Sequence, residues 1–254
     1  MNRDESKKIN DDKILIAKMR DKEKICRVKN KISNTSFLDM YQKSILIKEV
    51  KDNFIVYGGY DGADREIILF YPDKLKYEIA FKYFDSLLSI IRISLPNDLK
   101  GEYEHRVYLS GMMKLGIERE KFGDIIVSEN GADIIVFSEI AEYIKNSLKD
   151  LKRFSKCNIE ILELKDISTR IDEYDEFNII IPSLRVDSVV SEVGRMSRNH
   201  ASDVINEGRV FINSELVYKD SKIVKIGDIL TIRGKGKFII DGIVRETEKR
   251  KVSY

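Results

Sequence analysis

Residues 197–200, which read Ser-Arg-Asn-His, have the residue types of an anion-binding helix start. Ser197 is a typical N-cap, and the first backbone N–H groups of the helix that follows it point outward at the positive end of its dipole. Such an end is a ready site for phosphate. Arg198 stands in this first turn, away from the apolar stripe of the helix, and a guanidinium group suits phosphate oxygens. We therefore predict that this turn binds phosphate.

More cations stand at the ends of neighbouring elements. Arg185 begins the preceding helix, off its valine stripe, while Arg233, Lys235 and Lys237 lie in or beside a Gly-Lys-Gly-Lys run after a strand. Glycines there would let the backbone approach a ligand closely. The alternative is structural: the serine only caps its helix, and Arg185 pairs with an acid such as Asp187. Capping and phosphate binding are compatible with each other.

The elements that must position these residues form a small α/β unit. Valines at 186, 189, 190 and 193 repeat with the spacing of one helix face, and a second helix ends at Gly208. Three short strands follow, at 209–213, 215–219 and 228–234.

The centre of the chain alternates between strand and helix patterns. Strands are predicted at 86–95 and 157–164, two more at 124–137 across a turn at Asn130-Gly131, and helices at 103–116 and 138–151. Ser138 is the predicted cap of the second helix. The order β-α-β-β-α-β is that of a ferredoxin-like or RRM-like sandwich.

The N-terminal part reads as helical and then mixed. Residues 14–32 show a helical apolar side, and strands at 54–57 and 66–71 surround a glycine-rich loop. That loop, Gly58 to Gly62, lacks the motif of a P-loop or a dinucleotide fold, so we interpret it as a tight turn. The fold class is therefore α+β, with three domains predicted at 1–75, 76–176 and 182–254.

Charge is distributed unevenly along the 254 residues, whose formal net charge is +2. Residues 1–36 carry 11 Lys and Arg against 6 Asp and Glu, and residues 183–254 carry 14 against 10. Residues 37–182 carry 20 against 27. Basic ends around an acidic centre favour a polyanion held by the ends, or solvated lysines with no partner.

Several classes of protein do not fit the sequence. No apolar run approaches the roughly 18 residues of a membrane span, and the first residues lack the apolar segment of a secretory signal. The two cysteines are far apart and there are only two histidines, so we expect no structural metal site, and reduced, buried cysteines in a cytoplasmic protein. We expect no cofactor and no catalytic residues.

The C-terminal unit resembles the RNA-binding domain named after ribosomal small-subunit protein four, here called the S-four domain. The matching residues are Leu184-Arg185-Val186-Asp187, Ser197-Arg198, Ala201, Ile205, Gly208-Arg209-Val210, Ile212-Asn213, Gly227-Asp228 and Ile232-Arg233-Gly234. Upstream, "GGYDGADR" and "HRVYLSGMMKLGIEREKFGDIIV" are similar to signature segments of the YlmH family, which carries an RRM-like domain before an S-four domain.

This resemblance implies a non-catalytic binder of structured RNA, rRNA or tRNA. Its expected partner is the large ribosomal subunit with a tRNA, in the rescue of stalled translation. The RNA-binding residues that we predict are Arg185, Asp187, Ser197, Arg198, Asn199, His200, Arg209, Arg233, Lys235 and Lys237.

A second, weaker RNA patch is predicted in the central domain. It consists of His105, Arg106, Lys114, Arg119 and Lys121, and its alternative is a solvated helix end. The aromatic motif with which an RRM stacks bases is absent from the sequence. Two other functions stay open: an RNA-modifying enzyme of the pseudouridine synthase or methyltransferase type that docks through the S-four unit, and a protein partner bound by the acidic middle region.

Overall fold

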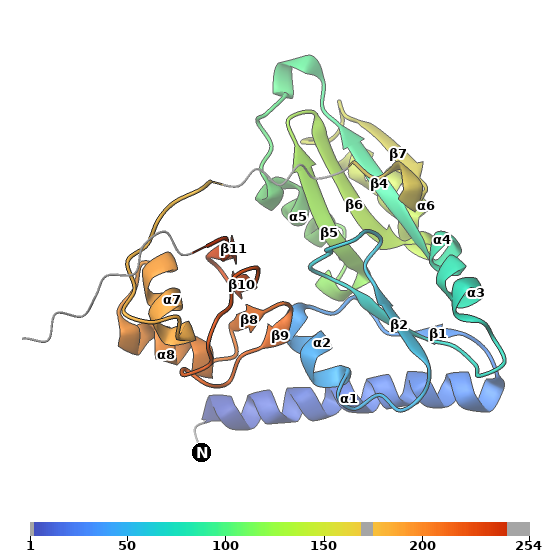
Figure 1. The fold of residues 1–254 in the computed structure, drawn as a ribbon. Coiled ribbons are helices and arrows are strands. Elements are labelled where there is room, and N and C mark those ends of the chain that lie inside the picture. The colour runs from blue at the N-terminus through green and yellow to red at the C-terminus, as the bar shows by residue number, and fades with distance from the viewer. Residues whose placement is uncertain (1–2, 169–174, 243–254) are drawn as a thin grey trace, which may run out of the picture. The chain divides into compact units, whose positions relative to one another are not determined.

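The computed structural model describes residues 3–168 and 175–242. The chain divides at residue 173 into two compact units, called here the first and the second unit. Helices and antiparallel sheets occur in both of them, so the predicted α+β class is confirmed (Figure 1).

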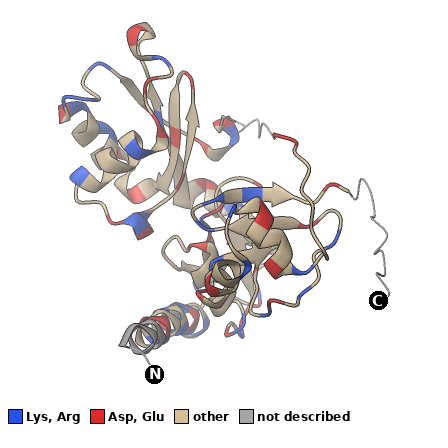
Figure 2. Ribbon diagram, turned by 90° about the vertical axis from the view of Figure 1, so that its left-hand side faces the viewer, with Lys and Arg blue, Asp and Glu red and all other residues tan. Residues whose placement is uncertain are grey.

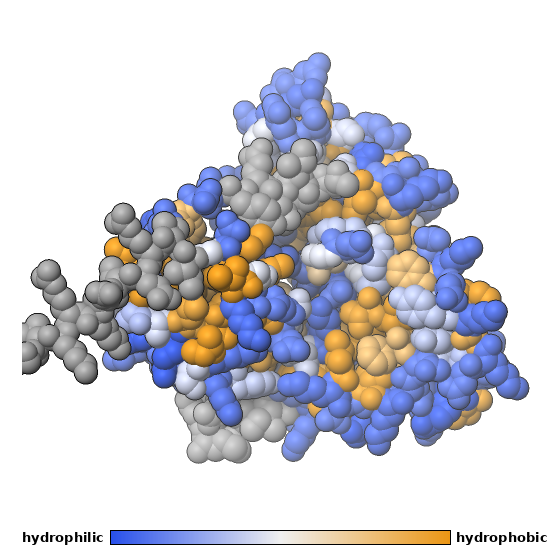
Figure 3. Space-filling view, viewed as in Figure 1, coloured by the Kyte–Doolittle hydropathy of each residue, from blue (hydrophilic) through white to orange (hydrophobic). Residues whose placement is uncertain are grey.

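The first unit begins with a long helix and a small sheet. Their bounds are α1 (Arg3–Lys29), β1 (Ser33–Asn34), α2 (Met40–Leu46), β2 (Phe54–Tyr57) and β3 (Ile67–Phe70). The strands pair antiparallel in the order β1-β3-β2. The predicted apolar side of α1 is confirmed, since Met19 and Cys26 are buried in a cluster with Leu46, Ile68 and Phe70. The exposed part of α1 is mostly charged but includes Ile14, Ile25 and Val28. Hydrophilic residues prevail along the lower right edge of Figure 3.

The predicted β-α-β-β-α-β order occurs in the centre of the chain. Its elements are β4 (Leu88–Ser94), α5 (His105–Lys114), β5 (Phe122–Ser128), β6 (Gly131–Phe137), α6 (Ser138–Asp150) and β7 (Asn158–Leu162). The strands form one antiparallel sheet in the order β5-β6-β4-β7. Shorter helical segments accompany them: α3 (Tyr77–Lys82), α4 (Phe84–Leu87), η1 (Asn97–Leu99), η2 (Arg119–Lys121) and η3 (Leu164–Asp166).

Both faces of this sheet are covered. Ile134 and Val136 of β6 pack in the cluster formed with α5 and α6, while Ile135 and Phe137 pack in another cluster with β2 and β3. Every residue of β6 is buried as a result. The segments 1–75 and 76–176 thus share a core, and a domain boundary at residue 75 stays a prediction.

The start of α6 differs from the sequence prediction. Phe137 is the N-cap and makes no side-chain capping hydrogen bond, while Ser138 is the first helical residue. The Ser138 hydroxyl hydrogen-bonds Ser89 of β4 instead, with 2.8 Å between the two oxygens. The capping role predicted for Ser138 is therefore wrong, because a partner from another element takes its hydroxyl.

The second unit packs two helices against a four-stranded sheet. Its elements are α7 (Val186–Val193), α8 (Arg198–Asn206), β8 (Val210–Ile212), β9 (Glu215–Leu216), β10 (Ile229–Ile232) and β11 (Gly236–Ile239). The order is β11-β10-β8-β9, and every pair is antiparallel. The core contains the predicted apolar faces of both helices. Strand β11, which the sequence did not predict, turns the Gly-Lys-Gly-Lys run into part of a β-hairpin.

Candidate nucleic-acid interface

The opening turn of α8 has the capped geometry that its sequence predicts. The Ser197 side chain accepts a hydrogen bond from the backbone N–H of His200, with 3.2 Å between Oγ and N. Ala201, Val204 and Ile205 are buried on the other side of the helix. All four residues from 197 to 200 are exposed, so the core holds the helix while its first turn faces solvent.

Arg185, the N-cap residue of α7, lies against Asp187. Its Nε donates to Oδ1 of Asp187 at 3.0 Å and its Nη2 donates to Oδ2 at 3.2 Å. The ion pair named above as the alternative for Arg185 is therefore present. Hydrogen bonds from Arg185 are the main reason why the pKa of Asp187 is lowered. The arginine side chain stays 42% exposed, so its outer edge is open to a further ligand.

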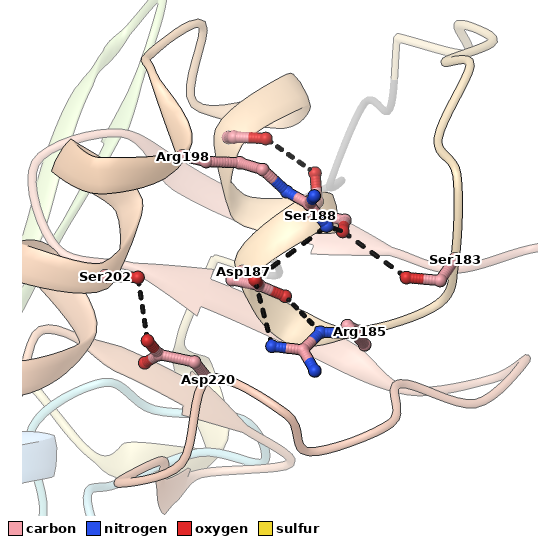
Figure 4. A network of polar contacts seen from close by, with 8 residues as sticks. Ser183, Arg185, Asp187, Ser188, Arg198, Ser202 and Asp220 are labelled. Atoms are coloured by element: carbon pink, nitrogen blue, oxygen red, sulfur yellow. Dashed lines mark hydrogen bonds and ion pairs between the residues drawn. The ribbon is translucent and has the colours of Figure 1, made fainter.

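Arg198 approaches the same carboxylate from the second helix. Its Nη2 donates to the hydroxyl of Ser188 and lies 3.8 Å from Oδ2 of Asp187. Two guanidinium groups from different helices thus converge on one carboxylate (Figure 4). Since Asp187 cancels only one of the two positive charges, and a guanidinium has several donors, an anion can bind at the exposed edges.

A loop from the sheet side fixes where α7 begins. The backbone N–H of Val186 donates to the carbonyl of Lys222 at 2.8 Å, and that of Asp187 donates to the carbonyl of Asp220 at 3.2 Å. The Asp220 side chain accepts from Ser202 of α8 at 2.7 Å. Ser188, Ser202 and Asp220 were missed by the sequence reasoning, because no local pattern shows that they meet.

A second cationic group surrounds the β10–β11 hairpin. The Nη2 of Arg209 donates to the carbonyl of Arg233 at 3.0 Å, and the backbone N–H of Arg233 donates to the carbonyl of Arg209 at 2.9 Å. Arg209 also pairs with Glu207 at 3.2 Å. Arg233, Lys235 and Lys237 are exposed on this hairpin.

The predicted residues thus fall into two groups. Arg185, Asp187 and Arg198 lie together at the start of α8, with the exposed Asn199 and His200 in the same turn. The hairpin group attaches through Arg209, which follows the other end of α8. Nine helical residues span about 13 Å, so the sequence-predicted surface is built from two separated clusters. Lys and Arg are likewise interspersed with Asp and Glu across the ribbon in Figure 2.

The predicted central patch is less concentrated. His105 and Arg106 begin α5 and Lys114 ends it, and all three are exposed. Arg119 is turned inward: its Nη1 donates to the carbonyls of Phe122 and Gly123, both at 2.8 Å. Burial, with repulsion from Arg65, lowers the pKa of Arg119 to about 10. Arg119 therefore serves the fold rather than an exposed phosphate site.

Asp124 organises the glycine-rich loop, a role that the sequence did not indicate. Its carboxylate accepts hydrogen bonds from the Tyr60 hydroxyl at 2.8 Å and from the backbone N–H groups of Asp64 and Arg65 at 2.7 and 3.2 Å. Burial raises the pKa of Asp124. A Cβ on Gly58 would lie 2.3 Å from the carbonyl oxygen of Arg65, so only glycine fits there. The predicted tight turn is confirmed.

The covered sheet excludes one mode of RNA binding. An RRM stacks bases on aromatic side chains of its open sheet face. Here Ile55, Ile67 and Leu69 pack against that face, beside Ile135 and Phe137 of β6. Any RNA contact of the first unit must therefore use its loops, helices or cavities.

The described residues offer no metal-binding cluster and no candidate membrane span. In residues 3–168 and 175–242, no three or more His, Cys, Asp or Glu side chains gather as a metal-binding group. Within the same ranges, no helix has both the length and the apolar character needed to cross a bilayer. Cys26 and Cys157 are free and buried, and burial raises the pKa of each thiol.

Comparison with known proteins shows which family and which proteins the chain is similar to. Residues 83–166 match a family model described as "Putative RNA-binding domain in YlmH". The chain is 27% identical over 252 residues to "Ribosome-associated protein quality control protein P2" of Bacillus subtilis (strain 168), which covers 95% of this chain and 93% of the relative. A solved structure, "Cell division protein ylmH from Streptococcus pneumoniae", aligns with a TM-score of 0.45 at 23% identity, over 63% of this chain and 92% of that one.

Proposed function

This chain belongs to the YlmH family of RNA-binding proteins, and from that premise we propose that its second unit binds structured RNA on the ribosome through phosphate contacts. The partner that we propose is the large ribosomal subunit carrying a tRNA, and the occasion is the rescue of stalled translation. The name of the Bacillus subtilis relative, a ribosome-associated quality control protein, supports this assignment.

One observation carries the proposal: two half-exposed guanidinium groups are held around Asp187 beside the exposed first turn of α8. Because Asp187 and Ser188 orient Arg185 and Arg198 in advance, less side-chain entropy is lost when a phosphate binds. The first-turn N–H groups of α8 add donors at the same place. Such a surface binds the RNA backbone, so it recognises the shape and charge of the RNA more than its base sequence.

The proposed role has no catalytic step. The three buried carboxylates described in the first unit are all engaged in the fold. Glu23 accepts hydrogen bonds from the backbone N–H groups of Lys51 and Asp52, Asp124 holds the glycine-rich loop, and Asp133 pairs with Arg92. Mass spectrometry of bulk RNA from a deletion strain tests this point directly. Loss of a modified nucleoside in that strain would favour the RNA-modifying enzyme instead.

The binding proposal is tested with purified large ribosomal subunits titrated at several salt concentrations. Arg185→Gln and Arg198→Gln should each weaken binding by about five- to tenfold and reduce the salt slope by about one unit, since each removes one phosphate contact. Lys152→Gln is the control, because it removes an exposed cation of the first unit, outside the proposed surface. If both arginine variants bind with unchanged affinity and slope, the assigned surface is wrong.

A further inference from the structure

A cavity of about 300 Å³ lies in the first unit, between the long helix and the central sheet. Its walls come from α1, β1, the α3–α4 segment, η2 and the start of α6. The wall includes Lys22, Asn34, Tyr83 and Lys121. The volume is at the lower end of the range for small-molecule sites, so the cavity is large enough for one small ligand group rather than a duplex.

Two lysines from elements that are remote in sequence line this cavity. Lys22 belongs to α1 and Lys121 to η2. Neither lysine forms an ion pair with another described residue. The wall also contains Glu139. Two lysines and one glutamate leave the cavity with a net positive charge. This charge favours an anionic ligand group.

The remaining wall offers an aromatic ring and neutral polar groups. Tyr83 is 40% exposed, which leaves part of its side chain accessible for stacking. The Nδ2 of Asn34 donates to the carbonyl of Thr35 at 2.9 Å. This bond does not use Oδ1 of Asn34, which can accept a hydrogen bond from a ligand. Ser36 belongs to the same wall. Amide and hydroxyl groups of this kind can hydrogen-bond the edge of a base.

We propose that this cavity holds a single unpaired nucleotide of an RNA strand, with its phosphate between Lys22 and Lys121 and its base against Tyr83. Proteins recognise unpaired RNA by stacking splayed-out bases on aromatic rings and hydrogen-bonding their edges. Tyr83 and Lys121 both lie in the region that matches the RNA-binding family model. The inference rests on the proposed function, and it adds a site for unpaired RNA to the phosphate-binding surface of the second unit.

The first test uses the full chain and a fluorescently labelled oligouridine of about ten nucleotides, a length within the range that single-strand-binding domains occupy. Tyr83→Ala should weaken binding of this probe by about tenfold, since stacking of one base contributes on that scale, and Tyr83→Phe should keep it. Lys22→Gln combined with Lys121→Gln should also weaken it about tenfold. The matched control combines Lys24→Gln and Lys149→Gln, two exposed lysines of α1 and α6 outside the cavity wall.

The same variants are then tested with large ribosomal subunits, which separates the two proposals. If the cavity variants bind oligouridine like the unchanged protein, the cavity proposal is overturned, while sensitivity to Arg198→Gln still supports the function proposed above. If the cavity variants lose oligouridine binding but the arginine variants bind ribosomal subunits with unchanged affinity, the cavity proposal is supported and the phosphate-binding surface of the second unit is overturned. Absence of oligouridine binding by the unchanged protein also overturns the cavity proposal.

A second measurement needs no variant and so does not depend on whether one folds. Oligouridine that contains 4-thiouridine is crosslinked to the unchanged full chain by light, and the crosslinked peptides are identified by mass spectrometry. A crosslink at Tyr83 or on the peptide that contains Lys121 supports the cavity. Crosslinks confined to residues 183–240 overturn it.

Discussion

Arg92 and Asp133 face each other across strands β4 and β6 and form a two-point ion pair. Nε of Arg92 donates to Oδ1 at 2.8 Å and Nη2 donates to Oδ2 at 2.7 Å. The same guanidinium donates to the carbonyl of Asp166 at 2.7 Å, and the backbone N–H of Ser168 donates to Asp133 at 2.8 Å. The pair thus fastens the segment after β7 to the middle of the sheet.

Replacing Asp133 should destabilise the first unit. The carboxylate is 2% exposed and the arginine 29%, so Asp133→Asn leaves a partly desolvated guanidinium without its counter-charge. We expect a loss of about 2–3 kcal/mol in the free energy of unfolding, somewhat less than for a fully buried pair. Urea denaturation at neutral pH measures it, with Glu142→Gln, an exposed site on α6, as the control. A change below about 0.5 kcal/mol, the usual size for a surface site, would contradict the assignment.

The same variant has a pH signature. Burial acts to raise the pKa of Asp133, but the hydrogen bonds from Arg92 and Ser168 outweigh it and the pKa is lowered in the folded protein. A lowered pKa contributes stability above the pKa of the unfolded chain, and this stability is lost as pH falls through the folded value. The difference between the unchanged protein and Asp133→Asn should therefore shrink below about pH 4. A difference that stays constant down to the acid transition would argue against the ion pair.

Arg119 should contribute to the stability of the first unit. Arg119→Gln removes two internal hydrogen bonds and the contact of the guanidinium over the Phe122 ring, at 4.4 Å from its centroid. We expect a loss of about 2 kcal/mol in unfolding free energy, since hydrogen bonds from a charged group are lost. Arg106→Gln, an exposed control on α5, should leave stability unchanged. Equal thermal stability of both variants would show that Arg119 is not part of the core.

The sequence predicted well the elements whose signal is local. The helix faces of α7 and α8 and the β-α-β-β-α-β order follow from apolar spacing, which depends only on near neighbours in the chain. Strand β11 was not predicted because its sequence, Gly-Lys-Phe-Ile, shows no alternation of apolar and polar residues. The strand is defined by its pairing with β10.

Contacts between distant residues could not be predicted in the same way. In the sequence, nothing distinguishes Arg119 from a surface arginine. Its inward position is defined by hydrogen bonds to two carbonyls of β5. The Ser188 and Asp220 contacts depend on how two helices and a loop meet in space. For the site, residue types alone placed Arg185 and Arg198 at helix starts, but they could not show that Asp187 lies between them.

Asp187 therefore offers the sharpest test of the arginine cluster. Counting charges alone, Asp187→Asn should strengthen RNA binding, because it removes a negative charge beside two arginines. We expect the opposite, a loss of about three- to tenfold in affinity for large ribosomal subunits, because the carboxylate holds Arg185 and draws Arg198 into position. The measurement is a titration at fixed salt, with Asp203→Asn, an exposed site of α8, as the charge-matched control. Tighter binding by Asp187→Asn would show that the carboxylate competes with phosphate instead of orienting the arginines.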